Sequence, residues 1–560
     1  MSALSFDRRQ FLGAGAASIA GVALPSCATL RSEREFDLVL SGGRIVDGDG
    51  GAAFDADVGL RGDTIVAIGA LDRRRASRVL DITGLCLAPG FVDIHTHSDR
   101  SIFEWPQADS RIRQGCTTEI TGNCGGSAAP RDAARSDDEG GPTAEWTDVT
   151  SYAKAWDAND AALNQALLIG HGTLRSAVLG DVDRAATSEE LAEMVRRLEL
   201  ALTQGAIGLS TGLEYVPGIY TPPAEIVELA RVVARHGGLY ASHIRSEEEH
   251  LLDAIGEVID VARRTGVRTQ ISHLKACGRG NWSAQDPAIE LIERARGEGL
   301  DVMADAYPYT AYSTGLSILL EPWSREGGAA AILARLRDPE QRARMLLEVA
   351  PHVARDPGGF ELIVIASVEG AALQACVGKD MAEIARAWNV EPAEAFLRML
   401  EGSAADVGYV GHGMSERNVE RVLAQPFVMV GSDGRAMAPS GRALENRPHP
   451  RSYGTFPRVL AHYCRERGLF DLPTAVRRMT SMPADRAGLV GRGRIARGAK
   501  ADLVAFDFER VRDGATFDAP QSFPDGIVHV FVNGVAVVAN EATTGARPGR
   551  LLRAPHDVRG

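Results

Sequence analysis

Eight short apolar runs alternate with helical stretches through the middle of the chain, and this alternation constrains the fold more than any other feature of the sequence. Such a pattern is typical of βα units that build a parallel sheet. Eight strands are the number that a closed (β/α)8 barrel requires. We therefore predict a TIM barrel, of the α/β class, with strands at residues 91–94, 117–120, 166–169, 206–209, 238–241, 268–271, 301–305 and 427–430.

The helices between these strands are predicted from apolar residues that recur at helical spacing. They fall at residues 188–202, 223–236, 247–264 and 287–296. From about 315 to 420 the alternation loosens, and an extra apolar run stands at 361–367. We interpret this segment as an insertion between strands seven and eight. It is expected at the mouth of the active site, where it would act as a lid.

The two ends of the chain have a different pattern, in which apolar and polar residues alternate between glycine-rich turns. This alternation predicts short antiparallel strands near residues 36–47 and 63–69, and again near 501–507 and 527–534. We expect residues 36–90 and 488–560 to meet in one small β-sandwich domain that flanks the barrel of residues 91–487. A length of 560 residues suits a barrel-sized domain with one accessory domain.

Residues 1–30 resemble a twin-arginine signal peptide, because Arg8 and Arg9 precede an apolar run rich in Gly and Ala. The run is too short and too weakly hydrophobic for a membrane-spanning helix. We therefore expect export to the periplasm and no transmembrane span. Cys27 resembles a lipidation cysteine, whereas Pro25 departs from the usual motif, so a lipid anchor and cleavage without lipid both remain open.

The overall composition excludes some classes of partner. The formal net charge of -13 and the pI near 5.6 argue against a nucleic-acid partner, because nucleic-acid binders usually carry a basic face. An anionic substrate would need a local cationic pocket. The seven cysteines include no CxxC pair, so neither a disulfide framework nor a structural zinc module is predicted.

Metal-capable side chains follow five of the eight predicted strands. In a barrel all strand ends open onto the same face, where catalytic groups collect. His95 and His97 are two residues apart on a strand, so both imidazoles point the same way. Zinc takes imidazole, thiolate and carboxylate ligands, and a catalytic site leaves one position open. The predicted metal ligands are His95, His97, Cys124, His243, His273 and Asp433.

Two of these residues, Cys124 and Asp433, lie in sequence contexts that allow more than one role. Cys124 lies in a Gly-Asn-Cys-Gly-Gly turn, and we favour a metal ligand over a nucleophile because a metal keeps a thiol deprotonated. Asp433 lies in Gly-Ser-Asp-Gly, which is also the pattern of a plain turn. A carboxylate beside a metal would take a proton from the attacking water and pass it to the leaving group.

These motifs resemble the amidohydrolase superfamily and, within it, the N-acyl-D-amino-acid deacylases, or D-aminoacylases. The resemblance covers almost the whole chain beyond the signal. The Gly-Asn-Cys-Gly cysteine discriminates best, because many superfamily relatives place a carboxylated lysine at the metals instead. The matching segments are residues 88–99, 122–125, 208–215, 242–245, 272–275, 306–309, 431–434 and 447–456.

The resemblance implies zinc-dependent hydrolysis of N-acyl-D-amino acids to a carboxylic acid and a D-amino acid. It implies that Cys124, His243 and His273 hold a tightly bound Zn²⁺. It further implies that His95, His97 and Asp433 form a second, weaker position, with Asp433 as the catalytic acid and base. An arginine fork suits a planar carboxylate. By the same matching, the substrate α-carboxylate would be bound by Lys275, Tyr307, Ser313 and Arg451.

Three alternatives remain open at this point. A dipeptidase that acts on a C-terminal D-residue performs the same reaction, so the small-molecule partner is an N-acyl amino acid or a dipeptide. A cyclic-amide hydrolase of the dihydroorotase or hydantoinase kind shares the His-x-His start, but the cysteine counts against it. An inactive binding protein on the same fold would be expected to lose ligands. Residues 434–446 form a longer loop than in the best-known members, so the side-chain preference is not transferred.

Overall fold

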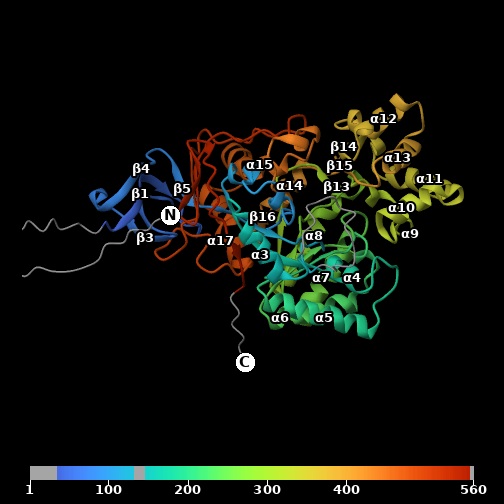
Figure 1. Ribbon diagram of the computed structural model, residues 1–560, viewed down its shortest axis with the longest axis horizontal. Coiled ribbons are helices and arrows are strands. Elements are labelled where there is room, and N and C mark those ends of the chain that lie inside the picture. Colours follow the sequence, from blue (N-terminus) through green and yellow to red (C-terminus); the bar gives the residue numbers. More distant parts are fainter. Residues whose placement is uncertain (1–33, 131–145, 555–560) are drawn as a thin grey trace, which may run out of the picture.

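The computed structural model describes residues 34–130 and 146–554, and its centre is a parallel barrel (Figure 1). The strands follow the order β16-β12-β11-β10-β9-β8-β7-β6. The predicted barrel is thereby confirmed, and each strand overlaps a predicted apolar run. The strands are β6 (Phe91–Asp93), β7 (Cys116–Thr121), β8 (Asn164–Gly170), β9 (Gly208–Gly212), β10 (Leu239–His243), β11 (Arg268–Ile271), β12 (Val302–Ala306) and β16 (Val428–Val430). The predicted signal peptide lies outside the described residues.

The first and last barrel strands meet just beyond their ends. Asp433 donates its backbone N–H to the His95 carbonyl at 2.8 Å, and His97 donates to the Gly434 carbonyl at 2.8 Å. These two hydrogen bonds bring the segment after β16 beside the segment after β6. The ring closes at the level where the candidate metal ligands stand.

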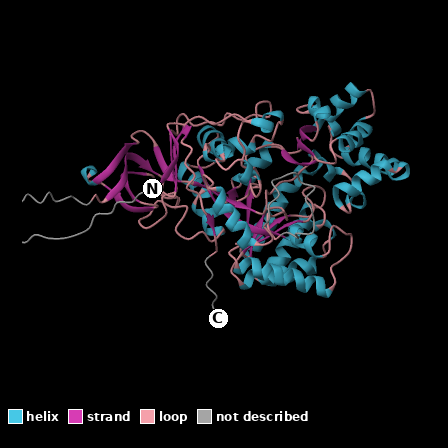
Figure 2. Cartoon of the chain, in the orientation of Figure 1, coloured by secondary structure: helices cyan, strands magenta, loops and turns pink. Residues whose placement is uncertain are grey.

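Helices surround the barrel, while the strands lie inside (Figure 2). Helix α5 begins in a capping box in which Thr187 accepts from the Glu190 backbone and Glu190 accepts from the Thr187 backbone. The helices on the barrel are α3 (Val149–Asn159), α4 (His171–Val178), α5 (Ser188–Thr203), α6 (Pro223–Arg235), α7 (Leu251–Thr265), α8 (Gln285–Gly297), α14 (Glu416–Leu423), α15 (Arg451–Arg458), α16 (Leu472–Met479) and α17 (Ser481–Arg486).

The prediction of a helix over residues 247–264 was wrong at its start. Helix α7 begins at Leu251, and Glu247 lies in the loop that follows β10. The Glu247 carbonyl accepts the Cys277 N–H at 2.7 Å, and its carboxylate contacts His273. Tertiary partners therefore hold this residue out of the helix that its sequence pattern favours.

An insertion with its own core stands between β12 and β16. A three-stranded antiparallel sheet, in the order β13-β15-β14, packs against short helices on the side of the molecule away from the β domain (Figure 1). It runs from Tyr312 to Gly411, somewhat earlier than the expected 315–420. Its elements are β13 (Tyr312–Gly315), α9 (Pro322–Arg325), α10 (Gly328–Arg337), α11 (Pro339–Val353), β14 (Ile363–Val368), α12 (Met381–Trp388), α13 (Pro392–Gly402) and β15 (Val407–Gly411).

The terminal segments join in a β domain, as their alternating pattern predicts. Its strands are hydrogen-bonded into one continuous sheet of nine, in the order β20-β19-β18-β17-β5-β1-β2-β3 with β4 on β1. Leu503 and Ala505 face a core within this domain, whereas Val504 and Phe506 on the other face join the barrel core. The strands are β1 (Phe36–Ile45), β2 (Phe54–Arg61), β3 (Thr64–Gly69), β4 (Ala76–Asp81), β5 (Cys86–Pro89), β17 (Leu503–Phe506), β18 (Ile527–Val532), β19 (Val535–Ala539) and β20 (Ala542–Thr543).

The last described segment does not stay in the β domain, which corrects the expected extent of 488–560. Strand β21 (Leu551–Leu552) pairs in parallel with β8, and Ala554 donates its N–H to the Gly205 carbonyl at 3.1 Å. Gly549 makes this approach possible, because a Cβ there would lie 2.0 Å from the Leu163 carbonyl oxygen. The C-terminal segment thus adds a strand at the amino-terminal end of β8.

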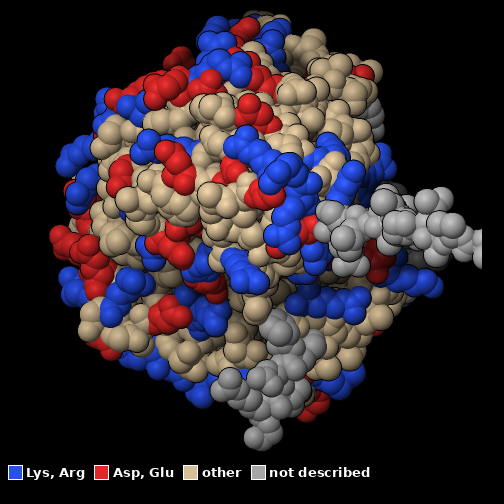
Figure 3. Space-filling model, turned by 90° about the vertical axis from the view of Figure 1, so that its left-hand side faces the viewer, with Lys and Arg blue, Asp and Glu red and all other residues tan. Residues whose placement is uncertain are grey.

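On the face toward the β domain, acidic and basic side chains are interspersed (Figure 3). Exposed ion pairs of the protein include Arg75 with Glu35 at 2.7 Å and Arg494 with Asp485 at 2.7 Å. Within residues 34–130 and 146–554, no helix combines the length and the apolar character needed to cross a bilayer.

A buried arginine lies behind the strand ends and joins several elements. Arg111, in helix α2 (Asp109–Ile112), is fully buried and donates to the Glu119 carboxylate at 2.7 Å. It also contacts the Asp93 carboxylate and donates to the Ser432 hydroxyl at 3.1 Å. This side chain therefore links β6, β7 and the segment after β16.

Arg111→Met should lower the free energy of unfolding by about 3–5 kcal/mol, because it leaves two buried carboxylates without their counter-charge. Chemical denaturation monitored by circular dichroism measures this. The matched control is Arg264→Met, which removes an exposed ion pair to Asp260 at 3.4 Å and should cost less than about 0.5 kcal/mol. A loss below about 1 kcal/mol for Arg111→Met would contradict the structural role argued here.

Candidate active site

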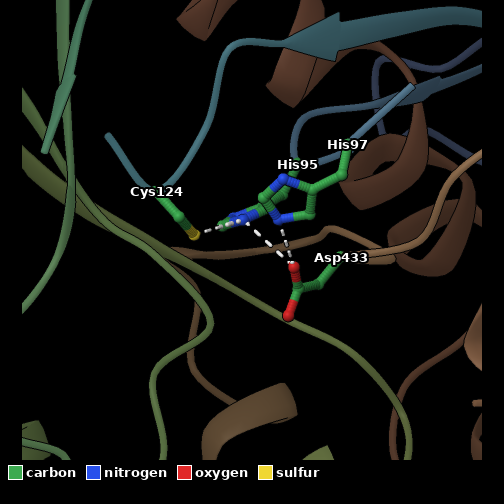
Figure 4. Close-up of side chains that lie close together, drawn as sticks. All are labelled: His95, His97, Cys124 and Asp433. Carbon is green, nitrogen blue, oxygen red and sulfur yellow. Dashed lines mark hydrogen bonds and ion pairs between the residues drawn. The ribbon is translucent and has the colours of Figure 1, made fainter. Parts of the chain in front are cut away.

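The structure brings all six predicted metal ligands to the carboxyl ends of the barrel strands. They form two groups that share Cys124, and within each group the donor atoms lie within 4.8 Å of one another. Figure 4 shows the first group, with the side chains converging from separate strand ends. The first group is His95, His97, Cys124 and Asp433, and the second is Cys124, His243 and His273.

The distances within the groups place the thiol between them. Cys124 Sγ lies 3.3 Å from His95 Nε2 and 3.4 Å from His273 Nε2. Asp433 Oδ1 lies 2.8 Å from His97 Nε2 and 3.4 Å from His95 Nε2 (Figure 4). Each group therefore contains donors at the separation that a shared ion requires.

Three of these residues have a left-handed backbone. The φ angles are 52° at Cys124, 34° at His273 and 52° at Asp433. Such conformations cost a non-glycine residue about 1–3 kcal/mol each and persist where the surroundings fix them. Gly122 takes part in this, since a Cβ there would lie 1.9 Å from the Leu168 carbonyl oxygen. The strained backbone at these three residues thus directs their side chains toward the donor cluster.

Three histidines are each oriented by a carboxylate on the side away from the cluster. This arrangement fixes the ring and leaves its other nitrogen directed at the donor groups, as is usual for metal-binding histidines. The distances are 3.1 Å for His95 Nδ1 to Asp305 Oδ1, 2.8 Å for His273 Nδ1 to Glu247 Oε1, and 2.9 Å for His243 Nε2 to Glu214 Oε2.

Sequence reasoning missed these three carboxylates. Asp305 ends the seventh apolar run, and Glu214 lies within a segment that matches the family. Sequence analysis covered both positions but assigned no function to either residue. Glu247 was assigned to a helix face, where a glutamate is ordinary. The available signal was position alone, since Asp305 ends a predicted strand and Glu214 and Glu247 follow theirs by five or six residues.

The donor set fits Zn²⁺. Burial alone would raise the pKa of the Cys124 thiol, but the charges of His95 and His273 outweigh it and hold that pKa well below its usual value. Burial would likewise raise the pKa of the Asp433 carboxyl, but the charge of Arg451 keeps it well below its usual range. Thiolate, imidazole and carboxylate together are the ligands that zinc prefers.

The four predicted substrate-binding residues lie beside this cluster. The Tyr307 ring is flanked by two cations, with the Arg451 guanidinium 5.0 Å and Lys275 Nζ 5.7 Å from its centroid. Arg451 Nη1 lies 2.7 Å from Asp433 Oδ2, and Arg451 Nη2 donates to the Ser313 carbonyl at 3.0 Å. The Ser313 contact is made by its backbone carbonyl. Together they provide a local cationic pocket in an acidic chain.

Lys275 and Arg451 are both held in place by neighbours. Lys275 Nζ lies 2.5 Å from Glu247 Oε1, and this partner raises the pKa of Lys275 against the opposing effect of burial. Arg451 donates its backbone N–H to His449 Nδ1 at 3.0 Å, while His449 Nε2 lies 2.9 Å from the Ala311 carbonyl. The buried His449 ring therefore joins the start of α15 to the segment before β13.

A cavity of about 720 Å³ opens over the cluster. Its volume lies in the range typical of small-molecule sites. The insertion contributes Ser313 and Arg325 to its lining, and the long loop contributes Met437 and Asn446. The segments with the least regular sequence patterns thus form much of the wall that a substrate would meet.

Comparison with known proteins identifies related sequences. The model of a family described as "Amidohydrolase family" matches residues 78–352 and 418–538. A D-aminoacylase of Alcaligenes xylosoxydans xylosoxydans is 40% identical, over 92% of this chain and 97% of that protein. An N-acyl-D-glutamate deacylase of the same organism is 37% identical, over 94% of this chain and 99% of that protein.

Solved structures give the same relationship. A D-aminoacylase crystal structure has a TM-score of 0.79 and 36% identity, and it covers 92% of this chain and 100% of that one. The N-acyl-D-glutamate deacylase from Bordetella bronchiseptica, complexed with zinc and a phosphonate inhibitor, has a TM-score of 0.79 and 35% identity, with 93% and 100% covered. A D-hydantoinase from Thermus sp. shares only the fold, at a TM-score of 0.53 and 17% identity over 93% of this chain and 99% of that one.

Proposed function

Because the chain belongs to the amidohydrolase family and, within it, to the D-aminoacylases, we propose that it is a zinc enzyme that hydrolyses N-acyl-D-amino acids. The products are a carboxylic acid and a D-amino acid. The observation that carries this proposal is the cluster in which Cys124 joins two donor groups, with Asp433 between the histidines and Arg451. A hydrolase of this kind needs a metal, a proton carrier and a carboxylate-binding group in one place.

The proposed metal assignment follows the two donor groups. Cys124, His243 and His273 would hold the tightly bound Zn²⁺, and His95, His97 and Asp433 would form a second, weaker position. When bound, Zn²⁺ supplies Lewis-acid polarisation of the acyl carbonyl and makes water more acidic. The carboxylates behind the histidines keep the imidazoles oriented for this role.

Asp433 is the proposed proton carrier. One of its oxygens faces His97 and the other faces Arg451, so the carboxylate is held ionised and ready to accept a proton. It would take a proton from the attacking water and deliver it to the nitrogen of the departing amine. Because the amine of an amino acid is a poor leaving group unless protonated, this second transfer decides whether the bond breaks.

The cationic pocket is proposed to orient the substrate. Arg451 and Lys275 would bind the α-carboxylate on the Tyr307 side of the cavity. Because Arg451 also contacts Asp433, a carboxylate bound there brings the adjacent amide nitrogen close to the proton carrier. A dipeptide with a C-terminal D-residue presents the same carboxylate and the same bond, so it falls within this proposal.

We also propose export by the twin-arginine route and a periplasmic location. The support is the sequence of residues 1–30, which lie outside the described part of the chain. A lipid anchor at Cys27 and cleavage without lipid are both compatible with it. Cell fractionation of the native host tests this, and recovery of the mature enzyme in the cytoplasm would contradict it.

The function is tested by amine release from paired N-acetyl-D and N-acetyl-L amino acids with purified, zinc-loaded protein. We expect hydrolysis of D substrates only, and no hydrolysis by protein whose zinc has been chelated. If neither enantiomer reacts while zinc is bound, the bond type is wrong. Dipeptides and cyclic amides would then be assayed with the same preparation.

A further inference from the structure

A buried arginine on the insertion faces the catalytic cavity without a counter-charge. Arg325, the last residue of α9, lines the cavity and is only 8% exposed. Its Nη1 donates to the Glu214 backbone carbonyl at 3.0 Å. Among the described residues, its buried Nε has no hydrogen-bond partner, and no carboxylate forms an ion pair with the guanidinium.

Most other buried arginines in the described part of this protein are compensated; Arg478, which lies outside the cavity, instead donates to the Leu423 and Ala424 backbone carbonyls. Arg111, Arg175 and Arg451 are also buried, and each contacts a carboxylate. Burial lowers the pKa of Arg325, because desolvation outweighs the nearby charge of Glu214. A buried cation that lacks a counter-ion is costly, so an anion in the cavity would be stabilised at this position.

A second side-chain nitrogen without a hydrogen-bond partner lies on the same wall. His352, in α11, also lines the cavity, and its buried Nδ1 makes no hydrogen bond within the described ranges. The Glu321 carboxylate is 3.7 Å from this nitrogen. Glu214, the other carboxylate at this wall, is bonded to His243. Arg325 and His352 thus line the same wall, and each has a buried side-chain nitrogen without a hydrogen-bond partner among the described residues.

The position of Arg325 relative to the metal cluster is fixed through one residue. Glu214 contacts His243 with its carboxylate and Arg325 with its carbonyl. Glu214 follows β9, whereas Arg451 begins the helix that follows the loop after β16, and these two strands stand on opposite sides of the eight-stranded ring. A substrate held at Arg451 by its α-carboxylate would therefore extend across the cluster toward Arg325.

We propose that Arg325, with His352, binds a second carboxylate of the substrate. The preferred substrates are then N-acyl-D-amino acids with two carboxylates, the second one carried by the amino-acid side chain or by the acyl chain. This inference rests on the proposed function. It adds a specificity site on the insertion to the α-carboxylate site at Arg451.

The test compares dicarboxylates with their neutral amide isosteres, which differ by one charge. The side-chain arm pairs N-acetyl-D-glutamate with N-acetyl-D-glutamine, and the acyl arm pairs N-succinyl-D-leucine with N-succinamoyl-D-leucine. Loss of a hydrogen bond to a charged group costs about 10- to 100-fold. We expect kcat/KM of the wild type to favour the dicarboxylate by this factor in one arm, and that arm identifies the source of the carboxylate.

Arg325→Met should abolish this preference while changing kcat/KM for the amide isostere by less than about threefold. The isostere thus reports whether the variant is folded and active. The matched control is Arg355→Met, which removes another arginine of the same cavity whose side chain is 56% exposed. Arg355→Met should keep the preference.

The wild-type comparison needs no variant, so it stands even where Arg325→Met fails to fold. Equal rates for dicarboxylate and isostere in both arms overturn the proposed site, as does a preference that survives Arg325→Met. If none of the four compounds is hydrolysed, the proposed function fails together with this inference. If the compounds are hydrolysed with no preference for the dicarboxylates, the proposed site at Arg325 is refuted and the proposed function stands.

Discussion

Asp433→Asn lowers kcat by about 10²–10⁴-fold while the tightly bound zinc is retained, because the amide keeps the size of the side chain but cannot accept the proton. The three residues assigned to the tight position do not include Asp433, so metal analysis should find that ion still present. Steady-state kinetics with an N-acetyl-D-amino acid, together with zinc analysis of the same sample, measures both quantities.

The control for this variant is Glu249→Gln, which neutralises another carboxylate that lines the cavity. Glu249 is exposed and contacts only the exposed side chains of His250 at 3.5 Å and Arg355 at 3.7 Å among the described residues, so this change should leave kcat nearly unaltered. Activity of Asp433→Asn within tenfold of the wild type would show that another group carries the proton. The contacts of Asp433 with His97 and Arg451 would then stabilise the site without taking part in proton transfer.

Cys124→Ala should lower both the zinc content and the activity, the latter by at least about 10²-fold. The thiol is the one donor common to both groups, and no other described side chain occupies its position between His95 and His273. Zinc per protein after dialysis against metal-free buffer measures the effect directly.

Cys277→Ser is the matched control, since Cys277 is buried and also lines the cavity but belongs to neither donor group. It should retain zinc. The pair of variants also separates two roles for Cys124. An inactive Cys124→Ala protein that keeps all its zinc would point to the thiol as a nucleophile and would refute its assignment as a ligand.

The barrel and its metal-capable residues were predictable because their signals are local. A strand of a parallel barrel is a short apolar run, and its functional side chain stands at its end, as His243 does, or follows within a few residues, as Asp433 does. The conjunction of such residues after five strands then needs no knowledge of tertiary contacts. The family motifs added the roles of the residues, which spacing alone does not supply.

What escaped prediction depends on contacts between distant segments. Glu247 fits a helical pattern, and only its pairing with Lys275 and His273 reveals its position at the site. Arg451 contacts the backbone carbonyl of Ser313, and the residue type at position 313 does not reveal a backbone contact. Arg325 likewise reads as an ordinary arginine at a helix end until the fold buries it.

The pairing of β21 with β8 interleaves the two domains along the chain. Strand β8 is made early during synthesis, but its partner Leu551 leaves the ribosome only after nearly all of the other described residues. Both sheets therefore depend on the carboxyl-terminal region, since the β domain also needs β17 to β20. Neither domain is a contiguous piece that can be expressed alone, and a carboxyl-terminal fusion must leave residues 543–554 free to reach the base of the barrel.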